Sequence, residues 1–125
     1  MKMSEQTNNL PLKKADIPTD VFPWGRLEWF ARRTLNGLDI TLGFCHLSHG
    51  RENSHHIHPN CDEVLFVVKG SIIHRIGEDE IPMGEGDSLL IPKGVPHSAK
   101  NIGDFDAVLS ISFTNGDRQT VNVDA

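Results

Sequence analysis

Long apolar segments are missing from this 125-residue sequence. No stretch approaches the run of about 18 apolar residues that a membrane-spanning helix needs, so we expect no membrane partner. The N-terminal residues 1–16 include no apolar segment of the kind that defines a secretory signal peptide. Together these two absences predict a cytoplasmic protein.

Basic clusters and cysteine pairs are also scarce. The net charge is −5 and no basic cluster exceeds two adjacent residues, whereas a nucleic-acid-binding surface requires a basic stripe. We therefore expect no nucleic-acid partner. The two cysteines, Cys45 and Cys61, do not form a CxxC pair, which argues against a structural zinc knuckle. A disulfide between them is not expected in a cytosolic protein.

What the sequence does contain is a series of short apolar segments separated by turn residues. Its length suits one domain, and seven prolines and eleven glycines suit many turns. Residues 1–20 are polar and aperiodic, and we interpret them as an N-terminal arm before a single domain over residues 21–125. The strand-like segments are residues 27–33, 38–47, 64–68, 71–76, 81–83, 88–91, 97–102, 107–113 and 118–123. This all-β pattern predicts a sandwich or a barrel.

A β-hairpin is predicted near the start of the domain. Asn36-Gly37 lies between two strand-like segments and is typical of a tight hairpin turn. The segment that follows, residues 38–47, alternates apolar and polar positions with a period of two, which argues against a helix.

The segment 64–68 is apolar at every position, as in a strand that is covered on both faces. We expect Leu65 and Val67 to face the interior, together with Phe44 from the preceding segment. A second subunit would then cover the residues that point outward, so we predict a homodimer. The outward-facing residues are Val64, Phe66 and Val68.

The most informative stretch is residues 50–70. His56 and His58 are two positions apart, so in a β-strand their side chains point to the same face. After the turn residues 59–62, Glu63 begins an apolar strand and can return to the same space. Two imidazoles and one carboxylate suit a divalent transition metal, although histidines in a solvated loop would show the same spacing.

A second stretch, residues 86–101, has a short strand, a Pro/Gly turn and then His97 at the start of a further strand. Together the two stretches resemble the two motifs of the cupin superfamily. The first motif, G-x5-HxH-x4-E-x6-G, is matched by Gly50, His56, His58, Glu63 and Gly70. The second motif, G-x5-PxG-x2-H-x3-N, is matched by Gly86, Pro92, Gly94, His97 and Asn101. Every spacing is kept in both motifs.

The resemblance implies a double-stranded β-helix, also called a jelly roll, which forms the cupin β-barrel. It also implies that one divalent transition metal ion lies inside the barrel. The metal ligands that it implies are His56, His58, Glu63 and His97. Three imidazoles and one carboxylate match Fe, Mn, Ni, Zn or Cu, and ligand type does not separate these metals. Four protein ligands on a six-coordinate ion leave two positions for water or a substrate.

The function implied by the resemblance is that of a metal-dependent enzyme acting on a small oxygen-rich molecule. Small single-domain cupins include dioxygenases, lyases, and isomerases or cyclases. Glu63 would be the catalytic residue, moving off the metal to act as a base. The alternatives are a non-catalytic module that binds a small molecule and, least favoured by the intact ligand set, a metal-free structural or storage protein.

Four further residues keep two interpretations each. His55 adjoins the ligands, but strand alternation directs its side chain to the opposite face from His56. His74 either lines the pocket or lies in the core or on the surface, and Cys61 is either a thiol near the metal or a small residue that fills a turn. We favour the second interpretation for both. Trp24 either closes one end of the barrel or stacks on a ligand.

Overall fold

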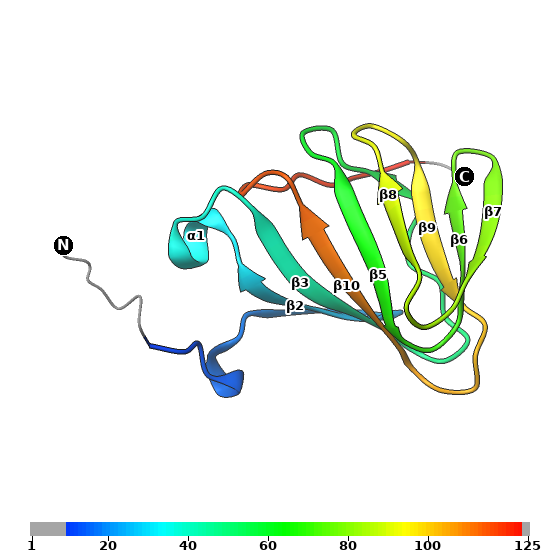
Figure 1. Ribbon diagram of the computed structural model, residues 1–125, viewed down its shortest axis with the longest axis horizontal. Helices are drawn as coiled ribbons and strands as arrows, with labels where there is room; N and C mark the ends of the chain where they lie inside the picture. Colours follow the sequence, from blue (N-terminus) through cyan, green and yellow to red (C-terminus); the bar gives the residue numbers. More distant parts are fainter. Residues whose placement is uncertain (1–9, 124–125) are drawn as a thin grey trace.

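Eleven antiparallel strands form the framework of the computed structural model, which describes residues 10–123 (Figure 1). The strands are β1 (Thr19–Phe22), β2 (Gly25–Ala31), β3 (Thr41–Leu47), β4 (His56–Ile57), β5 (Glu63–Lys69), β6 (Ile72–Ile76), β7 (Asp79–Met83), β8 (Ser88–Ile91), β9 (His97–Asn101), β10 (Ala107–Phe113) and β11 (Val121–Asn122). They form a six-stranded sheet, β1-β2-β3-β10-β5-β8, and a five-stranded sheet, β11-β4-β9-β6-β7. The two sheets form the jelly-roll barrel that the sequence predicts.

Helical structure is limited to two short turns in the described residues, a 3₁₀ turn at Lys14–Asp16 and α1 at Arg33–Asn36. No helix in this part of the chain is long and apolar enough to cross a membrane. Of the predicted N-terminal arm, residues 1–9 lie outside the described residues. The end of that segment, Thr19 and Asp20, belongs to β1 and pairs with β2.

The predicted hairpin between β2 and β3 is present, but its connection is longer than a two-residue turn. The two strands pair in antiparallel register, and α1 lies in the loop that connects them. Gly37 ends α1 with a φ of 76°, a left-handed conformation that favours glycine. As a result β3 begins at Thr41 and not at residue 38, and Leu38 and Ile40 are exposed in the connection.

The interior face of β3 differs from the prediction, because Phe44 points outward. Gly43 and Cys45 are the buried positions beside it, and Phe44 packs edge-on against Phe30 with ring centroids 4.9 Å apart. The reason is the size of Trp29 on β2, which is only 1% exposed. A Cβ atom at Gly43 would lie 2.6 Å from Trp29 Cε3, so only glycine fits at this buried position.

The faces of β5 agree with the prediction. Leu65 and Val67 are buried in the core between the two sheets. Burial of side chains of this size stabilises the fold by about 1.5–3 kcal/mol each. The outward-facing residues of β5 are 42–45% exposed; these are Val64, Phe66 and Val68.

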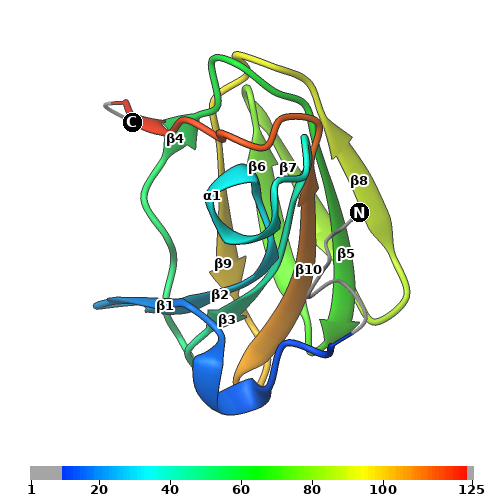
Figure 2. The same ribbon diagram turned by 90° about the vertical axis from the view of Figure 1, so that its left-hand side faces the viewer.

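The last part of the described chain crosses one end of the barrel. In Figure 2 this segment, coloured red, runs over that end toward β4. There β11 pairs with β4, with Val121 opposite Ile57 and Asn122 opposite His56. Residues 118–120 therefore lie close to the strand that carries the first motif histidines.

Candidate metal centre

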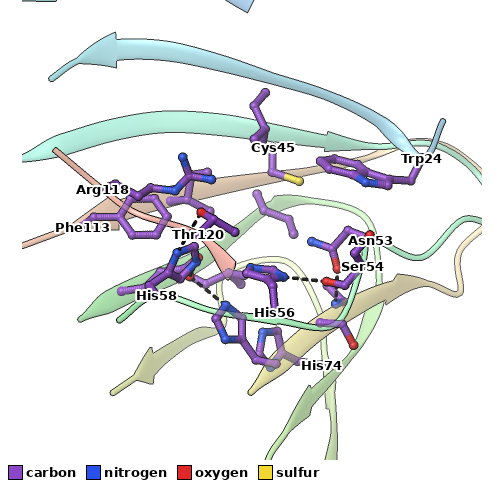
Figure 3. Close-up of a pocket in the computed structure, with 18 of the residues that line it drawn as sticks. Trp24, Cys45, Asn53, Ser54, His56, His58, His74, Phe113, Arg118 and Thr120 are labelled. Atoms are coloured by element: carbon purple, nitrogen blue, oxygen red, sulfur yellow. Dashed lines mark hydrogen bonds and ion pairs between the residues drawn. The ribbon is translucent and has the colours of Figure 1, made fainter. Parts of the chain in front are cut away.

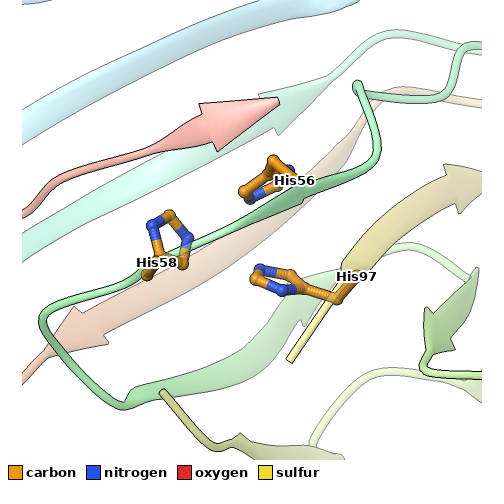
Figure 4. A group of neighbouring side chains, drawn as sticks. All are labelled: His56, His58 and His97. Carbon is orange, nitrogen blue, oxygen red and sulfur yellow. The ribbon is translucent and has the colours of Figure 1, made fainter. Parts of the chain in front are cut away.

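Three histidines converge inside the barrel (Figure 4). His56 lies on β4, His58 follows that strand, and His97 opens β9 as the direct register partner of His56. One ring nitrogen from each histidine lies within 4.8 Å of the others, and the ring centroids are 4.2–5.0 Å apart. His58 and His97 are each 3% exposed. The HxH spacing and the second motif thus bring three imidazoles to one point.

Each of these imidazoles is held through its Nδ1 atom by a backbone carbonyl oxygen. His56 Nδ1 lies 2.6 Å from the oxygen of Ser54, and His97 Nδ1 lies 2.9 Å from that of Val95. His58 Nδ1 lies 3.0 Å from the oxygen of Gln119. A carbonyl oxygen only accepts hydrogen bonds, so Nδ1 carries a proton in all three rings. Nε2 is then the nitrogen available to a metal ion, and the ring orientation is fixed.

Glu63 reaches the same space from the opposite sheet, where it begins β5. Its Oε1 atom lies 3.3 Å from His58 Nε2 and 3.2 Å from His97 Nε2. Burial alone would raise the pKa of Glu63, but the hydrogen bonds from His58 and His97 outweigh it and hold the pKa well below its usual range. Glu63 is therefore a buried carboxylate in contact with two of the three histidines.

The residues present fit a divalent transition metal ion. Burial, followed by the proximity of His97, lowers the pKa of His56 to about 4, so this ring is neutral at pH 7 as a metal ligand must be. Three imidazole nitrogens and one carboxylate oxygen are ligands that these metals accept.

The histidines line a cavity of about 160 Å³ inside the barrel (Figure 3). Part of its wall is apolar, and these side chains are Leu27, Leu65, Leu109, Ile111 and Phe113. Trp24 also lines the cavity, and its ring stacks on that of Phe22 with centroids 4.7 Å apart. As a lining residue, Trp24 can contact a molecule in the cavity.

His74 and His55 lie on different sides of the five-stranded sheet. His74 is 1% exposed and lines the cavity, with its ring 5.7 Å from that of His97 and nearly parallel to it. It is thus both a core residue and a pocket residue. His55 does not line this cavity, and its Nδ1 atom lies 3.3 Å from Ser98 Oγ.

The two cysteines also have different surroundings, and both are free. Cys61 packs in the hydrophobic core and does not line the cavity, which agrees with a small residue that fills a turn. Cys45 does line it, and burial raises the pKa of its thiol to about 12.

Arg118 and Thr120 are cavity residues to which the sequence assigned no role. Both come from the segment that crosses the end of the barrel, far along the chain from the two motifs. Their position depends on the pairing of β11 with β4, which no local pattern reveals.

Comparisons with known proteins agree with this fold. The family model described as "Cupin domain" matches residues 43–113. Among curated proteins, the auxin-binding protein ABP19b of Prunus persica is 36% identical over 86 residues, which are 65% of this chain and 41% of the peach protein. The chain spans less than half the length of the curated relatives that it matches.

Two solved structures show the same fold. An oxalate oxidase in complex with the substrate analogue glycolate has a TM-score of 0.80 at 22% identity, covering 98% of this chain and 68% of that chain. An oxalate decarboxylase of Bacillus subtilis, studied for its Mn(II) centres, has a TM-score of 0.79 at 19% identity, covering 87% of this chain and 30% of that chain.

Proposed function

Because the chain belongs to the cupin domain family, we propose that it binds one divalent transition metal ion inside its barrel. The proposed ligands are His56, His58, Glu63 and His97. The observation that carries the proposal is that all three imidazoles donate Nδ1–H to a backbone carbonyl, which leaves Nε2 for the metal. Fe, Mn, Ni, Zn and Cu all accept this ligand set, and Mn(II) is the metal named for the Bacillus subtilis neighbour.

The activity that we propose is that of a metal-dependent enzyme acting on a small oxygen-rich molecule, as a dioxygenase, a lyase or an isomerase. When bound, the metal supplies Lewis acidity to a substrate oxygen. Glu63 is the proposed catalytic residue, since its carboxylate lies in the cavity beside two of the histidines. It would accept a proton from the substrate, while the apolar wall excludes water from the reacting atoms.

A second candidate function is a binding module without catalysis. The name of the peach relative, an auxin-binding protein, favours this alternative. The same cavity and metal centre would then hold a small ligand and release it unchanged.

The first experiment is elemental analysis of purified protein by mass spectrometry, with His56→Ala and His97→Ala variants beside wild type. We expect close to one transition metal ion per chain in wild type and a loss of it in both variants. His49→Ala is the matched control, because His49 is exposed and does not line the cavity. A wild-type protein that takes up none of the five metals would overturn the proposal.

A second experiment separates the enzyme from the binding module. Metal is restored to apo protein, and oxygen consumption and product formation are followed with catechols, diketones and flavonols. Turnover that His56→Ala loses while it stays folded supports the enzyme. A ligand-dependent rise in melting temperature without any product supports the module.

We also propose that the chain forms a homodimer through the outer face of β5. Val64, Phe66 and Val68 expose an apolar strip there, and Leu90 on the neighbouring β8 is 59% exposed. Light scattering should give twice the chain mass of 13.9 kDa, and Phe66→Glu should shift the protein to a monomer. A single-chain mass for wild type at micromolar concentration would refute the dimer.

A further inference from the structure

Arg118 occupies a defined place in the cavity wall (Figure 3). Its guanidinium carbon lies 4.6 Å from the ring centroid of Trp29 and 5.0 Å from that of Phe113. Phe113 also packs edge-on against His58, with centroids 4.9 Å apart. Two buried aromatic rings therefore hold the guanidinium on the same side of the cavity as His58.

The guanidinium has no acidic partner in the described part of the chain. Its Nε atom is buried without a hydrogen-bond partner, and Arg118 forms no ion pair with the described residues. Asp20, an acidic residue nearby, instead accepts a hydrogen bond from Trp29 Nε1. Burial lowers the pKa of Arg118, but an arginine side chain stays protonated in proteins. Arg118 therefore brings a positive charge without an ion-pair partner among the described residues to the cavity wall.

The charges that line the cavity also favour an anion. Among the described residues of its wall, Glu63 and Arg118 are the only acidic and basic side chains apart from histidines, and their charges cancel. A divalent metal ion would raise the net charge of the site to +2, with no second carboxylate in the wall to offset it. A negatively charged ligand would lower the electrostatic free energy of this site.

The size and lining of the cavity restrict the rest of the ligand. Its volume of about 160 Å³ is close to that of the engineered apolar cavity of about 150 Å³ that binds benzene. Leu27, Leu109 and Ile111 supply apolar surface for the body of such a molecule.

We propose that Arg118 binds the carboxylate of a small substrate whose apolar body fills the rest of the cavity. The proposal rests on the proposed function of this cavity as the substrate site. The two terminal nitrogens of a guanidinium form a fork that matches the two oxygens of a carboxylate. Arg118 lines the cavity, and its terminal nitrogens are not among the buried unpartnered atoms of the described residues, so they are the donors that we assign to the ligand. Arg118 thus selects carboxylates over neutral molecules of the same shape.

The test compares benzoate with benzamide, its neutral isostere, by isothermal titration calorimetry. Both probes are titrated into EDTA-treated protein and into protein loaded with Mn²⁺. Wild type should bind benzoate at least about tenfold more tightly than benzamide in the metal-free form, because charge-assisted hydrogen bonds are roughly twice as strong as neutral ones. Arg118→Met should remove this preference, and Arg118→Lys should retain part of it. Arg75→Met is the control for lost charge, because Arg75 lies outside this cavity.

The metal-free and metal-loaded titrations separate this proposal from the metal centre. If the protein binds no metal but still prefers benzoate, and Arg118→Met loses this preference, the carboxylate proposal is supported and the metal proposal is refuted. If metal binds and Arg118→Met keeps the full preference, the role of Arg118 is refuted. Equal affinity of the wild-type protein for benzoate and benzamide in both forms also refutes the role of Arg118. This comparison uses wild-type protein alone, so it does not depend on whether the Arg118→Met variant folds.

Discussion

His58 Nδ1 lies 3.0 Å from the backbone carbonyl oxygen of Gln119, a residue 61 positions later in the chain. The contact connects the first motif to the segment that crosses the end of the barrel. Thr120 adds a second contact, because its hydroxyl lies 3.2 Å from the same Nδ1 atom. The orientation of His58 therefore depends on residues outside both motifs.

Thr120→Val tests this dependence. The substitution removes the hydroxyl but leaves the Gln119 carbonyl, so we expect metal affinity to fall by up to about tenfold, the lower end of the effect of losing a group that orients a metal ligand. Affinity is measured by competition with a chelator of known strength. Thr19→Val serves as control, because the Thr19 hydroxyl donates to the carbonyl of Ile17 and Thr19 does not line the cavity. Equal affinities for wild type and Thr120→Val would show that the carbonyl alone orients His58.

The convergence of the three histidines and Glu63 could be predicted from the sequence because it depends on motif spacing. His56 and His97 each meet a carbonyl two residues earlier in the chain, so their orientation is also a local property. The turn before β9 is local in the same sense, because it depends on Gly94 with a φ of 80°. By contrast, the contact of His58 with Gln119 joins distant segments, and no local pattern indicates it.

The interior face of β3 was mispredicted for a related reason. An alternating pattern gives two faces but does not say which one is buried, and the larger side chain of Phe44 suggested the wrong one. The deciding residue is Trp29 on the neighbouring strand, whose ring occupies the space above Gly43. Volume matching across strands is a tertiary property, and it outweighs the hydrophobicity of a single strand.

Gly43→Ala tests this packing. The added Cβ would lie 2.2 Å from the backbone oxygen of Glu28 and 2.6 Å from Trp29 Cε3, so the strands must move apart. We expect the free energy of unfolding to fall by about 1–3 kcal/mol, the usual cost of overpacking. Gly84→Ala is the matched control. An added Cβ at Gly84 has no heavy atom within 4 Å, and the φ of Gly84 is not in the left-handed region. Urea denaturation measures the free energy of unfolding of the two variants. A Gly43→Ala variant as stable as Gly84→Ala would contradict the claim that Trp29 leaves no room for a side chain at position 43.

His74 should make the stability of the metal-free protein depend on pH. Burial, followed by the proximity of His97, lowers the pKa of His74 from 6.5 to about 4. Between these values the unfolded chain binds a proton that the folded chain does not, so folding stability falls as pH decreases through this window. The loss reaches about 1.4 kcal/mol per pH unit for one such group.

His74→Leu removes this titration while keeping the site apolar and filled. In urea denaturation at pH 7, 6 and 5, the variant should lose stability less steeply than wild type. His56 titrates in the same direction in both proteins, and its contribution therefore cancels in the comparison. Parallel pH profiles for the two proteins would show that His74 is not held neutral by the fold.

Asn101, the last residue of the second motif, has a structural role that its spacing alone does not show. Its side chain is 2% exposed, and its Nδ2 donates to the carbonyl oxygens of Leu47 and Phe105. Its Oδ1 accepts from the N–H of Gly103. The amide thus joins the end of β3 to the loop between β9 and β10.

Asn101→Asp keeps the shape of this side chain and replaces the donor by an acceptor. At pH 7 a carboxylate would face two carbonyl oxygens, so we expect the variant to be less stable than wild type by about 1–3 kcal/mol or more. Burial without a donor raises the pKa of such a carboxyl group, and protonation restores one O–H donor. The difference from wild type should therefore narrow between pH 7 and pH 5 in urea denaturation. A difference that stays constant over this range would show that the donor role of the amide is not what stabilises the loop.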